Sequence, residues 1–188
     1  MANYVLFVSE NKIKDSTAIN GNVDVEFLLP YIKVAQTKYI HTKLGTDLYE
    51  KLKADITAST LTGAYQTLVD DFIGPSLVHW GFYECLPFLR FKVSNGNIYA
   101  KTSETGTALS TEEASSLREE VRNTAEFYTQ RLIDYIKNNL SSFPEYSTNT
   151  GADIRADRDA YYSGINLEIG QEQKRGITID NFLTPDLS

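Results

Sequence analysis

The stretch PSLVHWGFYECLPFLRF, from Pro75 to Phe91, is apolar on nearly every side of a helix. A surface helix keeps a polar face, whereas a helix that is apolar all round is surrounded by other elements. We therefore expect a central helix that begins near Pro75, because proline is favoured at the first helical position, and that is kinked or shortened near Pro87. The segment 72–91 is too interrupted for a bilayer span of about 20 residues, since it contains Pro75, His79, Glu84, Pro87 and Arg90.

A first helix is expected ahead of this central one, from an N-cap at Asp24 to Leu44. Pro30 leaves two alternatives, because the helix either starts at the proline or follows a short turn that bends into it. The apolar residues of this segment fall close to one face: Leu28, Ile32, Ala35, Tyr39 and Ile40.

Two further helices are expected before the central one. Gly45 ends the first helix and Thr46 begins the next at once, so the two helices meet in a sharp αα-corner. A third helix is predicted over residues 64–73, and Gly74 is expected to break it.

After the central helix, the sequence KVSNGNIYA predicts a small β-hairpin at about residues 92–100. Two short strand-like runs flank Asn95-Gly96, and both turn residues tolerate positive φ in a tight turn. A polar loop over residues 101–110 follows the hairpin.

A long helix is predicted from Thr111 to Leu140. Ser110 and Glu113 match a capping box at its start, and Pro144 prevents the helix from continuing far beyond its end. About 30 residues correspond to roughly 45 Å at 1.5 Å per residue. Apolar residues recur at helical spacing along it: Ala114, Leu117, Val121, Ala125, Tyr128, Leu132, Ile136 and Leu140.

The C-terminal arm, residues 147–188, has a different pattern. Its apolar residues alternate with polar ones in GINLEIG and GITID, which predicts two short strands. A hairpin formed by these two strands alone would be only marginally stable in water. We therefore expect the arm to dock on a partner surface, through Tyr161, Tyr162, Ile165, Leu167, Ile169, Ile177, Ile179 and Phe182. The predicted fold class is mainly α: a helical bundle (residues 1–146) with one long C-terminal helix, a small β-hairpin insertion and an extended C-terminal arm.

The composition excludes several functional classes. Twenty-five acidic and 18 basic residues give a net charge of −7, which provides no field that attracts nucleic-acid phosphates. The apolar run at the N-terminus, Tyr4–Val8, is too short for the core of a signal peptide, so we expect the chain to stay in the cytoplasm where it is made. The single cysteine, Cys85, allows no intrachain disulfide.

No catalytic or metal-binding motif stands out in the sequence. The two histidines are not at metal-ligand spacing, and we expect His79 to be buried in the central helix and His41 to lie at the surface. Cys85 sits in an apolar helix without a flanking base, which favours a packing role over a nucleophilic one. Glycine-rich phosphate loops and nucleophile elbows are absent from the sequence. No catalytic, metal or cofactor site is predicted.

Several strings together resemble a known protein family: VAQTKYIHTKLGTDLYEKL, AYQTLVDDFIGPSLVHWGFYECLPFL, VSNGNIY and AEFYTQRLIDYIKNNLSSFPEY. They are similar to small proteins encoded among the head and tail genes of tailed bacteriophages and prophages of Bacteroides-like hosts, including crAss-like phages. The resemblance covers residues 23–146. The order of short helices followed by a long one also resembles that of phage head-tail connector proteins, which are also called adaptor or head-completion proteins.

The resemblance implies a non-enzymatic structural protein of the virion. Connector proteins form a ring, commonly of twelve copies, that seals or extends the DNA channel beneath the portal. The partners implied are other copies of the chain, the portal protein and other neck or tail proteins, with DNA passing through the channel without specific binding and no contact with a membrane. The implied location is the neck or tail region of the virion, after assembly in the host cytoplasm.

Two other classes of protein stay open. A soluble binding module, such as a phage or host regulator, would be a monomer whose tail folds on a target. A small enzyme would place an unrecognised site around Glu84, His79 or Tyr83, all on the helix that we expect other helices to cover.

Overall fold

The computed structural model describes residues 4–19, 23–89, 91–94, 97–100, 110–148, 150 and 153–157. Within these ranges the chain is mainly helical, which confirms the predicted α class. The α-helices are α1 (Glu10–Ser16), α2 (Val25–Ala35), α3 (Thr42–Leu44), α4 (Thr46–Ala58), α5 (Gly63–Thr67), α6 (Gly74–Leu89) and α7 (Thr111–Asn138). The π-helical segments are η1 (Gln36–His41) and η2 (Leu68–Ile73), the 3₁₀ turns are η3 (Leu140–Ser142) and η4 (Pro144–Tyr146), and the strands are β1 (Phe91–Ser94) and β2 (Asn97–Ala100).

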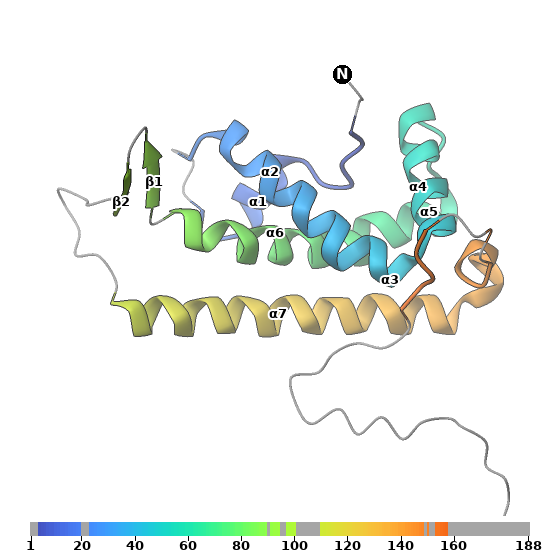
Figure 1. The fold of residues 1–188 in the computed structure, drawn as a ribbon. Helices are drawn as coiled ribbons and strands as arrows, with labels where there is room; N and C mark the ends of the chain where they lie inside the picture. Colours follow the sequence, from blue (N-terminus) through green and yellow to red (C-terminus); the bar gives the residue numbers. More distant parts are fainter. Residues whose placement is uncertain are drawn as a thin grey trace, which may run out of the picture.

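Helix α6 is the centre of the fold. It lies between α7 on one side and α2 with α1 on the other (Figure 1). This enclosure explains why its sequence is apolar all round, because each face meets another helix. Its buried side chains include Leu77, Val78, Trp80, Phe82 and Cys85. Within the described residues, no helix is long and apolar enough to cross a membrane.

The first predicted helix forms as one continuous rod of α2, η1 and α3. Asp24 caps it, and its side chain accepts a hydrogen bond from the Glu26 N–H at 3.0 Å. Pro30 is exposed within α2 and neither starts the helix nor interrupts it. The wider π turns of η1 keep Ala35 and Ile40, which are five residues apart, both buried.

Gly45 forms the sharp corner between this rod and α4. Its φ of +75° and ψ of 160° lie in a region that is essentially open only to glycine. Helix α4 begins at the next residue, and its buried side chains Leu48, Tyr49 and Leu52 face back toward the body.

The prediction that Gly74 breaks a helix is wrong. Segments α5, η2 and α6 follow one another without interruption, and Gly74 itself is helical with φ −53° and ψ −57°. The π turns of η2 stand where the ring of Pro75 would meet the carbonyl of residue 71 in a regular α-helix. The widened turn therefore accommodates the proline, and the helix continues through both residues.

The hairpin lies near the C-terminal end of α6 (Figure 1). Strands β1 and β2 pair antiparallel, with Phe91 opposite Ala100 and Ser94 opposite Asn97. The predicted turn at Asn95-Gly96 and residues 101–109 of the predicted loop over 101–110 lie outside the described residues.

Helix α7 runs alongside α6 and is 28 residues long (Figure 1). Both bonds of the capping box are present: the Ser110 N–H donates to Glu113 at 2.8 Å, and the Glu113 N–H donates to the Ser110 hydroxyl at 3.1 Å. Two 3₁₀ turns follow α7 and bury Phe143 and Tyr146 against the body.

Candidate functional site

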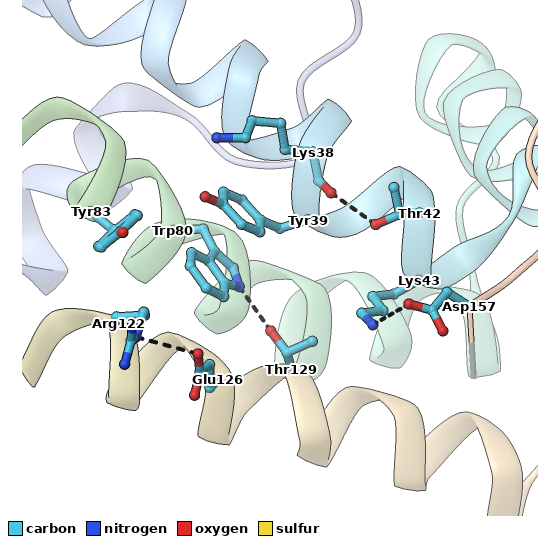
Figure 2. A pocket seen from close by; sticks show the side chains of 10 residues that line it. All are labelled: Lys38, Tyr39, Thr42, Lys43, Trp80, Tyr83, Arg122, Glu126, Thr129 and Asp157. Carbon is cyan, nitrogen blue, oxygen red and sulfur yellow. Dashed lines mark hydrogen bonds and ion pairs between the residues drawn. The ribbon is translucent and has the colours of Figure 1, made fainter. Parts of the chain in front are cut away.

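A cleft with aromatic walls opens between the first rod, α6 and α7 (Figure 2). Its volume is about 400 Å³. We call it the aromatic cleft, and its lining residues are Lys38, Tyr39, Thr42, Lys43, Trp80, Tyr83, Arg122, Glu126, Thr129 and Asp157.

Three aromatic rings form one wall of the aromatic cleft. The rings of Tyr39 and Trp80 stack with centroids 3.7 Å apart and planes 7° from parallel. Tyr83 meets Trp80 edge to face, with centroids 5.5 Å apart. The Arg118 guanidinium lies 4.2 Å from the centroid of the Tyr83 ring, a distance at which the ring quadrupole attracts a cation. Rings held in these geometries form a rigid surface that favours a flat, apolar occupant.

A buried hydrogen-bond cluster holds Trp80 in place. The indole Nε1–H of Trp80 donates to the Thr129 hydroxyl at 2.9 Å, as Figure 2 shows, and the Ser76 hydroxyl lies 2.9 Å from the same oxygen. The Thr129 hydroxyl in turn donates to the Ala125 carbonyl at 2.8 Å. All of these polar groups are buried, so losing the shared oxygen would leave donors unsatisfied.

Replacing Thr129 with valine is therefore expected to lower the free energy of unfolding by about 2 kcal/mol, since it removes the shared acceptor. Thr129→Ser is the matched control, because it keeps the hydroxyl and loses only a methyl group, at a cost of about 1 kcal/mol. Urea unfolding followed by Trp80 fluorescence measures both. A valine variant as stable as the serine variant would contradict the assigned role of the hydroxyl.

Charged side chains around the aromatic cleft are paired within the chain. Lys38 Nζ lies 2.6 Å from Glu84, and Lys43 Nζ lies 2.6 Å from Asp157. Arg122 Nε lies 3.4 Å from the Glu126 carboxylate, a pair that lines the cleft on α7 (Figure 2). The rim of the cleft is therefore close to neutral.

Glu84 links two sides of the aromatic wall. Its carboxylate also accepts a hydrogen bond from the Tyr39 hydroxyl at 2.7 Å. Burial alone would raise the pKa of Glu84, but the hydrogen bonds from Lys38 and Tyr39 outweigh burial and lower it. Burial first, and then the hydrogen bond to Glu84, raises the pKa of Tyr39 to about 12. Both groups thus keep their usual charge states at neutral pH.

The start of the C-terminal arm is anchored on the corner formed by η1, α3 and α4. We call Thr148, Thr150 and residues 153–157 the arm root. The Ile154 N–H donates to the Thr46 hydroxyl and the Thr46 N–H donates to the Ile154 carbonyl, both at 2.9 Å. The Asp157 N–H donates to the Thr42 carbonyl at 2.8 Å. Figure 1 shows this segment crossing from the corner toward α7.

Asp47, in the first turn of α4, anchors the other end of the arm root. Its carboxylate accepts hydrogen bonds from the hydroxyls of Thr148 and Thr150, each at 2.7 Å. These hydroxyls lower the pKa of Asp47. The described residues of the arm root are therefore held on the body at both ends, by backbone and side-chain hydrogen bonds.

The prediction that His41 lies at the surface is wrong, and the prediction that His79 is buried holds only in part. His41 is buried, with its ring stacked on Tyr49 at 4.3 Å and its Nε2 3.0 Å from the Thr46 hydroxyl. His79 is only partly buried and stacks on Tyr128 at 5.1 Å. The corner at Gly45 accounts for the difference, because it folds α4 back and brings Tyr49 over His41.

Burial lowers the pKa of both histidines below the usual 6.5. Below pH 6.5 the unfolded chain therefore binds more protons than the folded chain, and the free energy of unfolding falls as the pH decreases. We expect urea unfolding between pH 7.5 and 5.5 to show this decline, and the double variant His41→Gln/His79→Gln to flatten it. The same slope in the wild type and the variant would contradict this assignment.

The structure does not bring the candidate enzyme residues Glu84, His79 and Tyr83 to one site. Tyr83 lines the aromatic cleft, and Glu84 accepts a hydrogen bond from Tyr39 in the wall of the cleft. His79 instead lines a separate, open hollow of about 500 Å³ with Asp15 and Glu120. Cys85 is 1% exposed, and burial raises the pKa of its thiol to about 12. Among the residues that the structure describes, no group of His, Cys, Asp and Glu is arranged to hold a metal ion.

The arm residues that we predict to contact a partner lie outside the described residues: Tyr161, Tyr162, Ile165, Leu167, Ile169, Ile177, Ile179 and Phe182. Sequence reasoning missed the aromatic cleft and the arm root. The cleft depends on the stacking of Tyr39 on Trp80, which belong to different helices. No local spacing in the sequence predicts this contact. A weak signal for the arm root was available in the hydroxyls of Thr148 and Thr150, which suit a carboxylate partner.

The fold and the site define a small, mainly helical protein with an aromatic cleft and a C-terminal segment anchored on its own helical corner. The chain belongs to DUF6712, a family of unknown function, whose family model matches residues 40–156. The matched range contains the residues that line the cleft apart from Lys38, Tyr39 and Asp157. No curated protein and no solved structure matches the chain.

Proposed function

We propose that this chain is a non-enzymatic structural subunit of a tailed-bacteriophage virion, a head-tail connector in the neck between portal and tail. In this role, copies of the chain form a ring around the DNA channel and contact the portal protein and other neck or tail proteins. The chain is assembled in the host cytoplasm and then resides in the virion. The resemblance of residues 23–146 to small phage head and tail proteins supports this proposal.

The observation that carries the proposal is the anchored arm root. A subunit that is joined to its neighbours through a terminal arm needs the base of that arm fixed to its own body. With a flexible connection, the subunit could move although its arm stays bound to the neighbour. Here backbone bonds at Thr46 and Thr42 and the carboxylate of Asp47 fix the arm root. The residues after Asp157 thus start from a defined point on the body.

The sequence of the arm also supports an assembly role. It alternates apolar residues over two short runs and has few apolar residues otherwise, so the surface of a partner would offset the entropy of ordering it. Ring subunits meet through heterologous interfaces, on which an extended arm adds strands or fills grooves of the next copy. The net charge of −7 suits a channel wall along which a DNA duplex slides without being held.

Immunogold electron microscopy of particles purified from a host that encodes the chain tests this proposal. We expect the gold label at the junction of head and tail, and quantitative mass spectrometry of the particles should find the chain at about the copy number of the portal protein. Particles that lack the chain would overturn the proposal and favour the soluble binding module.

A further inference from the structure

We propose that the aromatic cleft is the docking site of the Tyr161–Tyr162 pair in the chain's own C-terminal arm. This inference does not need the connector proposal. It assigns Tyr161 and Tyr162 to the chain's own body in place of a partner surface, and it leaves the expected partner contacts to the arm residues from Ile165 onward. Three features carry it: the position at which the described chain ends, the chemistry of the cleft, and the length of the tether.

The described chain ends on the cleft itself. Asp157 lines the aromatic cleft, its N–H is fixed by the Thr42 carbonyl, and its carboxylate pairs with Lys43 on the same rim. Tyr161 follows four residues later, and Tyr161 and Tyr162 are the first aromatic residues after Asp157. Four residues span at most about 14 Å, so the pair cannot travel far from the cleft.

The chemistry of the cleft selects a neutral aromatic occupant. The walls are the rings of Tyr39, Trp80 and Tyr83, against which another ring packs in offset or edge-to-face geometry. Lys43 and Arg122 on the rim already have acidic partners, so a charged occupant would enter the cleft without a free counter-ion. A phenol ring brings no charge, and its hydroxyl can remain at the polar rim.

The volume of the cleft agrees with this occupant. A cavity of about 150 Å³ is sufficient for benzene in a protein core. The aromatic cleft, at about 400 Å³, therefore has room for a tyrosine side chain and part of its backbone.

The short tether favours the chain's own arm over the arm of a second copy. A flexible linker of a few residues gives an effective concentration in the millimolar range at a site within its reach. The arm of another copy would be present only at the concentration of the protein in solution, which is much lower than the effective concentration of the tethered pair. It would therefore compete poorly for the cleft. Docking in the cleft would also set the direction in which residues 163–188 leave the body.

Photo-crosslinking of the full chain tests the proposal. p-Benzoylphenylalanine replaces Tyr161 in one variant and Tyr162 in a second, since adjacent side chains of an extended backbone point to opposite sides and only one of them needs to face the cleft. The control variant carries the same group at Phe182, far along the arm. After irradiation of dilute protein, mass spectrometry identifies the crosslinked peptides.

We expect position 161 or 162 to crosslink to peptides that contain residues 38–43, 80–83 or 122–129, and position 182 to give none of these products. Mixing with an isotopically labelled chain that lacks the photo-reactive group distinguishes the source of the arm, because crosslinks within one chain contain no label. Labelled crosslinks to the cleft would overturn the proposal in favour of a second copy. Crosslinks elsewhere on the body, or the same products from position 182, would also overturn it.

A second measurement uses natural side chains only. Trp80 is the single tryptophan and lines the cleft, so its fluorescence reports on the cleft without background. In the variant Tyr161→Ala/Tyr162→Ala, acrylamide should quench Trp80 more strongly than in the wild type, whereas Phe182→Ala should leave the quenching unchanged. Equal quenching in the wild type and the double variant would overturn the proposal, even if the photo-reactive variants fold poorly.

Discussion

Gly45→Ala is expected to lower the free energy of unfolding by about 3 to 5 kcal/mol and to release the arm root. The φ of +75° with ψ of 160° costs a residue with a Cβ about 1 to 3 kcal/mol. In addition, a Cβ on Gly45 would lie 2.7 Å from the backbone nitrogen of Ala156, which is closer than real contacts allow. Ala156 would have to move, and the bonds between Thr46 and Ile154 would be lost at about 1 kcal/mol each.

Gly63→Ala is the matched control for this prediction. Gly63 also has a positive φ, of +59°, but nothing lies within 4 Å of a Cβ placed there. We expect this variant to lose about 1 kcal/mol, the cost of a left-handed backbone alone. Urea unfolding measures both variants, and hydrogen exchange at the Ile154 amide reports whether the arm root detaches. Equal losses in the two variants, with Ile154 still protected, would show that the close approach to Ala156 has no effect.

The second large effect is expected at Phe143, between the two 3₁₀ turns that follow α7. Its side chain is fully buried and meets the ring of Tyr65 edge to face at 5.4 Å and the ring of Tyr135 at 6.0 Å. Phe143→Ala removes these contacts and leaves a cavity that fixed 3₁₀ turns cannot readily fill. We expect a loss of about 3 to 5 kcal/mol in the free energy of unfolding.

Phe127→Ala is the corresponding control, because Phe127 lies on α7 with 61% of its surface exposed. The same chemical change there should alter the stability by less than about 0.5 kcal/mol. Chemical denaturation of both variants gives the comparison. If Phe143→Ala loses no more stability than Phe127→Ala, the C-terminal turns are not part of the cooperative core.

Features that depend on neighbouring residues were predictable from the sequence. The caps at Asp24 and Ser110 follow from side chains that reach the backbone two or three residues ahead. The corner at Gly45 follows from a backbone that only glycine adopts. The buried environment of α6 follows from a sequence with no polar face. In each case the physical cause lies within one or two helical turns.

The π-helical segments show where pattern reading was insufficient. Ala35 and Ile40 are both fully buried although they are five residues apart, and the same is true of Leu68 and Ile73. A regular α-helix turns by about 500° over five residues, which takes the second side chain off the first one's face. The wider turns of η1 and η2 compensate, so the spacing of five was the signal for them.

Features that join distant parts of the chain were not predictable. The Ile154 N–H donates a hydrogen bond to the Thr46 hydroxyl, 108 residues away in the sequence, and the Tyr39 ring stacks on Trp80 of another helix. No local spacing in the sequence links the two residues of either pair. The packing of α4 and α6 against the first rod brings these groups together, and this packing depends on the whole core.

The burial of Cys85 has a practical consequence for labelling the protein. Burial raises the pKa of the Cys85 thiol, so the thiol stays protonated at pH 7, and the sulfur is covered by the core. Cys85 is also the only cysteine in the chain. A cysteine introduced at an exposed position can therefore receive a fluorophore or spin label by thiol chemistry while the native residue stays unmodified and the core stays intact.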